Sequence, residues 1–204
     1  KVIPCWVHIH SENASIKLAP VHTSKEKCLN IFSLGGYWPY KNYHLIIEAM
    51  QLLRISHPDL LINYTQIGSN NEKLIALAEQ FDLLDRCHFL GIVTGDPFLL
   101  LKPKSFLVVP SREEGFCLAA VEALCRGIPS LLSNRKCLYD FKNYSDNLFW
   151  LDELCSSALA SQLLLLSTLT DEQYLHLSSS LQKEFSTQFS IETIAPNLIE
   201  FYDS

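Results

Sequence analysis

The chain lacks the short motifs that mark several common classes of site. No G-x-x-x-x-G-K-[ST] stretch occurs, which excludes a P-loop, and no G-x-G-x-x-G stretch occurs, so a dinucleotide-binding fold of that type lacks its fingerprint. No Cys-x-x-Cys pair is present either, and the seven cysteines are odd in number and scattered. They therefore predict neither a disulfide framework nor a zinc site.

Basic charge and long apolar runs are also scarce. Lys and Arg number 16 against 22 Asp and Glu, and a nucleic-acid backbone requires the opposite balance, a basic stripe. Apolar runs such as 163–166 are far too short to cross a membrane. We therefore expect no nucleic-acid partner and no membrane-spanning segment.

The cysteines suggest a cellular compartment, and the first residue suggests that the chain is part of a longer protein. Unpaired cysteines are typical of buried thiols in a reducing compartment, so we expect a cytoplasmic location. No signal peptide is visible and the chain begins with Lys1, so we expect a fragment of a longer protein. The cysteines are Cys5, Cys28, Cys87, Cys117, Cys125, Cys137 and Cys155.

Apolar runs alternate with helical patterns along most of the chain. Its 204 residues suffice for one large domain, and the alternation predicts an α/β fold, a doubly wound, Rossmann-like parallel sheet of about six strands followed by C-terminal helices. We expect strands at 28–34, 60–67, 87–90, 106–109, 128–133 and 148–151. We expect helices at 42–56, 70–84, 116–126, 156–169, 171–185 and 191–202, and a short helix that starts at 96–97.

The topology of such a sheet would bring two loops together. In the usual strand order 3-2-1-4-5-6, the first and fourth strands are neighbours at the switch point, and ligands bind outside their carboxyl ends. The first loop contains Gly35, Gly36 and Lys41, and the second contains Glu114 and Gly115. We expect both loops to border one crevice.

The stretch 111–129, with the sequence SREEGFCLAAVEALCRGIP, organises this second loop. It predicts a polar turn followed by a helix with almost no polar face, ended by Gly127 and Pro129. Glu122 is the one carboxylate in the middle of that helix, so we expect it to be buried and to meet hydrogen-bond donors.

Glu114 and Glu122 are eight positions apart, about 12 Å along a helix axis. The N–H groups at the start of the helix lie between them and favour an anion. A ligand with a phosphate between two hydroxyl-rich groups fits this arrangement, and a nucleotide-sugar is such a molecule. A glycosidase acid–base pair is the alternative, but its carboxyl groups would lie only about 5–9.5 Å apart.

The stretch Glu114-Gly115-Phe116-Cys117-Leu118, with Glu122 after it, resembles the E-x7-E signature of the retaining glycosyltransferases of family 4 (group 1), which have the GT-B fold. The resemblance implies that residues 29–204 form the C-terminal, donor-binding half and that residues 1–28 resemble the interdomain linker. It implies that Glu114 and the backbone of residues 115–118 contact the donor sugar and phosphates, while Glu122 holds the ribose.

The loop after the first strand resembles the family's G-R-x5-K-[GN] motif, with one departure. Lys41 matches the diphosphate-binding Lys, and with Glu114 it forms the implied catalytic pair; its alternative is a solvated surface Lys. The family's Arg is replaced by Gly36, so one of two phosphate cations is missing unless Arg112 substitutes for it. Cys117 stands where the family commonly has a second Gly.

The family resemblance implies further partners. Gly91, Ile92 and Val93 follow the third strand, where the family clasps the base through backbone atoms. The donor is a nucleotide-sugar, and the acceptor is held by an N-terminal half, absent here, through which peripheral membrane contact is possible. No cofactor or metal is implied, which agrees with the absence of Asp-x-Asp.

Some residues have weaker functional interpretations. The pair His8 and His10 has chelating spacing but no third ligand nearby. The three glycosylation sequons at Asn13, Asn63 and Asn143 are interpreted as accidental. Two other functions stay open: a binding module that has lost transfer activity, which Gly36 supports, and a related epimerase, which would need a catalytic base of its own.

Overall fold

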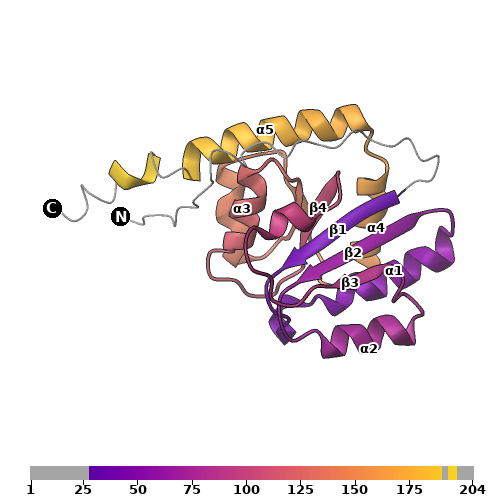
Figure 1. Ribbon diagram of the computed structural model, residues 1–204. Helices are drawn as coiled ribbons and strands as arrows, with labels where there is room; N and C mark the ends of the chain where they lie inside the picture. Colours follow the sequence, from indigo (N-terminus) through magenta and orange to yellow (C-terminus); the bar gives the residue numbers. More distant parts are fainter. Residues whose placement is uncertain (1–27, 190–192, 197–204) are drawn as a thin grey trace.

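The computed structural model describes residues 28–189 and 193–196, which fold around a six-stranded parallel sheet (Figure 1). The strand order is β3-β2-β1-β4-β5-β6, so the predicted doubly wound α/β fold is confirmed. The strands are β1 (Cys28–Leu34), β2 (Leu61–Ile67), β3 (Cys87–Phe89), β4 (Ser105–Val109), β5 (Ser130–Ser133) and β6 (Phe149–Leu151).

Helices connect the strands close to the predicted positions. The α-helices are α1 (His44–Ser56), α2 (Glu72–Gln80), α3 (Leu118–Cys125), α4 (Ser156–Ser167) and α5 (Asp171–Phe189). Short 3-10 helices are η2 (Pro39–Lys41), η3 (Pro97–Leu100) and η4 (Lys136–Asn143), of which only η3 was predicted from the sequence. Within the described residues, no helix is both long and apolar enough to cross a membrane.

Some sequence predictions fall on residues outside those described. The linker-like segment 1–28 lies outside them except for its last residue, as do His8, His10 and Asn13. Of the helix expected at 191–202, residues 193–196 are described and are helical.

The two faces of the sheet bury two separate apolar layers. Ile31 and Phe32 are adjacent in β1 and point to opposite faces, as the period of a strand requires. Ile31 packs in the layer formed with α1, α2 and α4, whereas Phe32 packs in the layer formed with α3 and α5. Both faces of the central strands are therefore covered by helices, and their carboxyl-end loops are left to build a site.

The loops after β1 and β4 are tied to each other at the switch point. The Asn42 side chain donates a hydrogen bond to the Pro110 carbonyl at 3.0 Å, and the Arg112 N–H donates to the Tyr40 carbonyl at 2.7 Å. These bonds join segments about seventy residues apart in sequence. The prediction that both loops border one crevice is thereby given its structural basis.

The loops after β1, β2 and β3 also lie against one another. The Gly35 N–H donates to the Ile67 carbonyl and the Gly68 N–H donates to the Gly91 carbonyl, both at 2.8 Å. Gly68 has φ +149, and a Cβ added to it would lie 2.2 Å from the Gly35 carbonyl oxygen. Only glycine allows these two loops to approach so closely.

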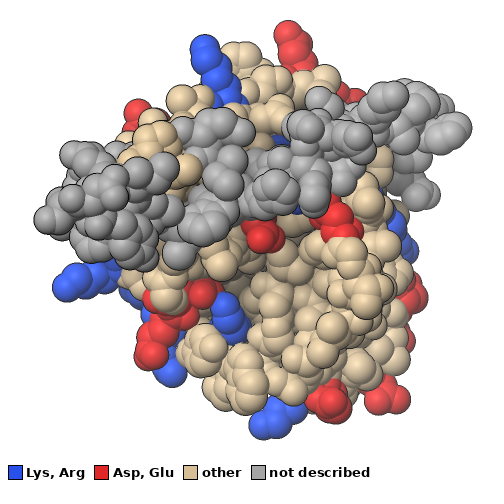
Figure 2. Space-filling model, turned by 60° about the vertical axis from the view of Figure 1, so that its left-hand side comes forward, with Lys and Arg blue, Asp and Glu red and all other residues tan. Residues whose placement is uncertain are grey.

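The described surface carries charges of both signs. On the face shown in Figure 2, Lys and Arg side chains lie interspersed with Asp and Glu side chains around a broad area of uncharged residues. No basic stripe crosses the described part of this face. A nucleic-acid backbone would find no continuous electropositive track here.

Candidate functional site

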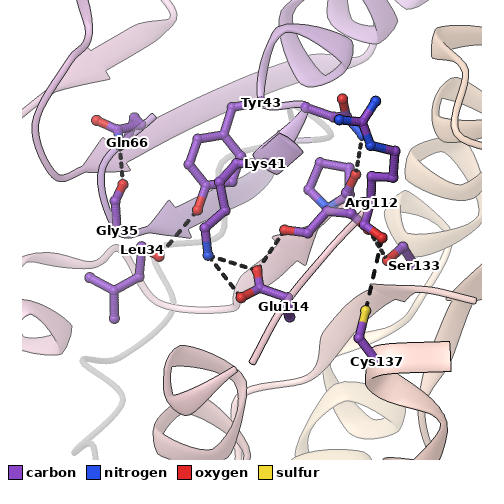
Figure 3. A network of polar contacts seen from close by, with 12 residues as sticks. Leu34, Gly35, Lys41, Tyr43, Gln66, Arg112, Glu114, Ser133 and Cys137 are labelled. Atoms are coloured by element: carbon purple, nitrogen blue, oxygen red, sulfur yellow. Dashed lines mark hydrogen bonds and ion pairs between the residues drawn. The ribbon is translucent and has the colours of Figure 1, made fainter. Parts of the chain in front are cut away.

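An ion pair between Lys41 and Glu114 joins the loops after β1 and β4 (Figure 3). The Lys41 Nζ donates to both carboxylate oxygens of Glu114, at 2.7 and 2.9 Å, and the Ser111 hydroxyl donates to Oε1 at 2.7 Å. The side chains of Lys41 and Glu114 are only 18% and 7% exposed. The alternative that Lys41 is a solvated surface residue is therefore wrong.

The position of Lys41 differs slightly from the sequence prediction. It ends the turn η2, and α1 begins only at His44, because Asn42 adopts a left-handed conformation with φ 54. Next to it, the Tyr43 hydroxyl donates to the Leu34 carbonyl at 3.2 Å. Burial, and secondarily the Glu114 carboxylate, raises the pKa of Tyr43, so its hydroxyl remains a hydrogen-bond donor.

All eleven predicted site residues line one of two adjoining pockets. The pockets share Leu34 and Ala119 and have volumes of about 350 and 390 Å³. The first pocket is lined by Lys41, Glu114, Gly115, Phe116, Cys117 and Leu118. The second pocket is lined by Gly35, Gly36, Gly91, Val93 and Glu122, together with Gly68 and Ser69. The structure thus brings the predicted residues together, although their roles in binding stay predictions.

The helix α3 begins at Leu118, two residues later than predicted, because Cys117 cannot be helical. Cys117 has φ 54 and ψ 59, a left-handed conformation that glycine adopts with less strain. Burial, together with the nearby Glu114 charge, raises the pKa of the Cys117 thiol to about 12. The thiol therefore stays protonated and packs as a small residue at the start of α3.

Three of the cysteines differ from the expectation that all would be buried. Cys87, Cys117 and Cys125 are buried, but Cys28 is exposed and Cys137 and Cys155 are partly exposed. All six described cysteines are free thiols.

Glu122 is less buried than the sequence predicted, and its carboxylate accepts no hydrogen bond from the described residues. It is partly exposed because this side of α3 faces the second pocket and not the core. Partial desolvation raises the pKa of Glu122, an effect that Arg126 opposes and Asp96 reinforces. The site therefore presents a poorly solvated acceptor suited to hydroxyl groups of a ligand.

Arg112 does not replace the cation that is missing at Gly36. Its side chain is 63% exposed and pairs at 3.5 Å with Glu113, which is 74% exposed. It lines neither pocket. The crevice therefore contains one cation, Lys41, among the described residues that line it.

Three polar residues at the site were not singled out from the sequence. Ser111 binds Glu114, Ser69 lines the second pocket, and Gln66 donates to the Gly35 carbonyl. Ser111 could have been found from its place in the 111–129 stretch, whereas Gln66 lies within the strand pattern of β2 and Ser69 lies in the loop that follows it. Among the described residues, no group of three or more His, Cys, Asp or Glu side chains is placed to hold a metal ion.

Curated relatives match part of this chain. The O-antigen chain mannosyltransferase RfbU of Salmonella typhimurium is 26% identical over 134 residues, which cover 62% of this chain and 37% of the relative. The chain therefore spans well under half the length of the curated relatives it matches first.

Solved structures share the fold at low sequence identity. Anabaena Alr3699/HepE, solved in complex with UDP and glucose, has a TM-score of 0.74 at 19% identity over 87% of this chain and 48% of that one. The C-terminal domain of a glycosyl transferase group 1 family protein (LpcC) from Francisella tularensis has a TM-score of 0.66 at 18% identity, over 80% of this chain and 87% of that one.

The family profile gives the assignment. The profile described as "Glycosyl transferases group 1" matches residues 16–173, which is more than half of the chain and includes every residue lining the two pockets. This chain belongs to the glycosyl transferases group 1 family.

Proposed function

We propose that this chain is the donor-binding half of a retaining glycosyltransferase that moves a sugar from a nucleotide-sugar to an acceptor. The observation that carries the proposal is the pair of adjoining pockets, one with the Lys41–Glu114 ion pair and the other with Glu122. The structure of HepE with UDP and glucose, which shares the fold, supports a nucleotide-sugar as the donor.

The chemistry of the two pockets suggests how the donor is divided between them. Glu122 offers a carboxylate to the ribose hydroxyls, next to the backbone of Gly91 and Val93 for the base. Lys41 and the N–H groups at the start of α3 would stabilise the diphosphate as it departs, because they concentrate positive charge where negative charge develops. Glu114, next to Gly115–Leu118, would orient the transferred sugar.

In our proposal, the acceptor site and the other side of the cleft belong to the part of the protein that precedes this domain. Residues 1–28 would be the linker to it, and any contact with a membrane would also be made there. The reaction would need no metal or cofactor, since Lys41 and the helix N–H groups supply the positive charge. A reducing, cytoplasmic compartment is consistent with six free thiols.

The first test is binding of a nucleoside diphosphate to the 204-residue chain, measured by calorimetry with UDP, GDP and ADP. We expect weak binding of one of them, because our proposal places half of the cleft outside these residues. If none of the three gives a heat of binding at millimolar concentration, the donor-site assignment is contradicted.

Glu122→Gln is expected to weaken this binding by about 1.5–3 kcal/mol, the value of a hydrogen bond to a charged group. Because desolvation raises the pKa of Glu122, wild-type affinity should fall with decreasing pH sooner than an ordinary carboxylate would allow. The Glu122→Gln variant should lack this pH dependence. Glu113→Gln is the matched control, since Glu113 is exposed and outside both pockets.

Transfer separates this proposal from its alternative, a module that has lost activity. Gly36 in place of a second cation favours the alternative. We expect the full-length protein to transfer labelled sugar and the 204-residue chain to show at most slow donor hydrolysis, because closing the cleft completes the catalytic set. A full-length protein that binds a donor but transfers to no acceptor would establish the binding module.

A further inference from the structure

The peptide between Gly35 and Gly36 is held in one orientation by Gln66. The Gln66 Nε2 donates to the Gly35 carbonyl at 2.7 Å, and the Gln66 residue is fully buried at the end of β2 (Figure 3). The described chain contains no cis peptide bond, so the Gly36 N–H points opposite to the Gly35 carbonyl. It therefore points away from Gln66, and Gly36 lines the second pocket.

Gln66 is a costly choice for this position. Its Oε1 atom is buried and has no hydrogen-bond partner, whereas an aliphatic side chain would fill a covered strand without that penalty. The hydrogen bond to Gly35 is the one side-chain bond that Gln66 makes among the described residues. The orientation of the Gly35–Gly36 peptide is the evident result of having glutamine here.

A second uncharged donor lies directly beside Gly36. A Cβ placed on Gly36 would be 2.7 Å from the Ser69 Oγ, and Ser69 lines the same pocket. The loop position is fixed by the Tyr37 N–H, which donates to the Ser69 carbonyl at 2.9 Å. Within the described part of the chain, neither the Gly36 N–H nor the Ser69 hydroxyl is engaged in a hydrogen bond.

We propose that the Gly36 N–H and the Ser69 hydroxyl bind a phosphate oxygen of the nucleotide-sugar donor, and that Gln66 is the positioning residue that turns the Gly36 N–H toward it. The inference rests on the proposed function and deepens it. The family's Arg, which would carry a positive charge at position 36, is replaced here by two neutral hydrogen-bond donors, the Gly36 N–H and the Ser69 hydroxyl. Such groups bind an anion without a charge of their own, and they would act beside Lys41, whose Nζ is paired with Glu114 in this structure.

Three variants of the 204-residue chain test this inference. Ser69→Ala removes the hydroxyl and Ser69→Thr keeps it. Gln66→Leu removes the hydrogen bond to Gly35 and puts an apolar side chain of similar size in its place. UDP and uridine are titrated against each by NMR chemical shifts, with thermal unfolding as the measure of folding. We expect Ser69→Ala and Gln66→Leu to weaken UDP binding about 10- to 100-fold, the effect of one lost hydrogen bond to a charged group, and to leave uridine binding unchanged. Ser69→Thr should bind both as the wild type does.

The outcomes distinguish this inference from the proposed function. A wild-type chain that binds none of UDP, GDP and ADP would overturn both. A wild-type chain that binds UDP, with unaltered affinity in Ser69→Ala, would overturn the inference alone. Equal losses for UDP and uridine would also overturn it, because they would indicate a structural effect on the whole pocket. If Gln66→Leu does not fold, the comparison of Ser69→Ala with Ser69→Thr decides the phosphate contact and Gln66→Met replaces the leucine variant.

Discussion

Lys41→Met is expected to destabilise the fold and to remove nucleoside diphosphate binding in a single substitution. The Glu114 carboxylate is 7% exposed and receives two hydrogen bonds from Lys41, so the variant leaves a nearly buried charge with Ser111 as its one remaining donor among the described residues. Breaking a buried pair from one side costs about 3–5 kcal/mol. Urea unfolding measures this loss, and calorimetry measures binding.

A second substitution separates the two effects. Lys41→Met combined with Glu114→Gln should recover most of the lost stability, because no unpaired charge remains, while diphosphate binding stays absent. Glu114→Gln alone should strengthen diphosphate binding, since Lys41 is then released from a charged partner. A Lys41→Met protein as stable as the wild type would show that the ion pair does not form in solution.

The fold was predictable because each strand and helix has a local signal. Phe106 to Val109 form an apolar run between polar residues, and such runs alternate with helical patterns throughout the chain. The parallel order then follows from the alternation itself. Turn η4 was missed because its eight residues form a 3-10 helix, which lacks the 3.6-residue periodicity of an α-helix.

The residues of the candidate site could be predicted where they belong to a sequence motif. The E-x7-E stretch, the motif at Lys41 and the loop after the third strand placed eleven residues that all line the two pockets. Contacts between distant positions could not be predicted, because they depend on how close two loops come. The bond from Gln66 to Gly35 and the ion pair from Lys41 to Glu114 are of this kind.

Exposure was also hard to predict within the buried-looking helix α3. Its residues are apolar on nearly every side, so the sequence indicated a helix surrounded by core. In the structure one side faces the crevice, where Leu118 is 47% exposed and Glu122 is only partly buried. A helix that borders a ligand pocket and a helix inside a core therefore have similar compositions.

Gly68→Ala is expected to be the most damaging single methyl group that can be added near the crevice. The new Cβ would lie 2.2 Å from the Gly35 carbonyl oxygen and 2.3 Å from its carbon, and both are backbone atoms that cannot rotate away. The loops after β1 and β2 must then separate, which breaks the bond from Gly35 to Ile67 and moves Gly36 in the second pocket.

Gly95→Ala is the matched control for this substitution, because it adds the same methyl group in the same crevice without a clash. Gly95 also has a positive φ, +87, but a Cβ there meets no atom within 4 Å, so we expect only the backbone strain, about 1–2 kcal/mol. For Gly68→Ala we expect the free energy of unfolding to fall by more than about 4 kcal/mol. Losses this large come from a specific structural cause, here the clash between two backbone segments. Chemical denaturation of both variants measures the difference. Equal losses would mean that the loops after β1 and β2 are not in close contact in solution, and the Gly35–Gly36 peptide would then not be held where a phosphate oxygen could bind it.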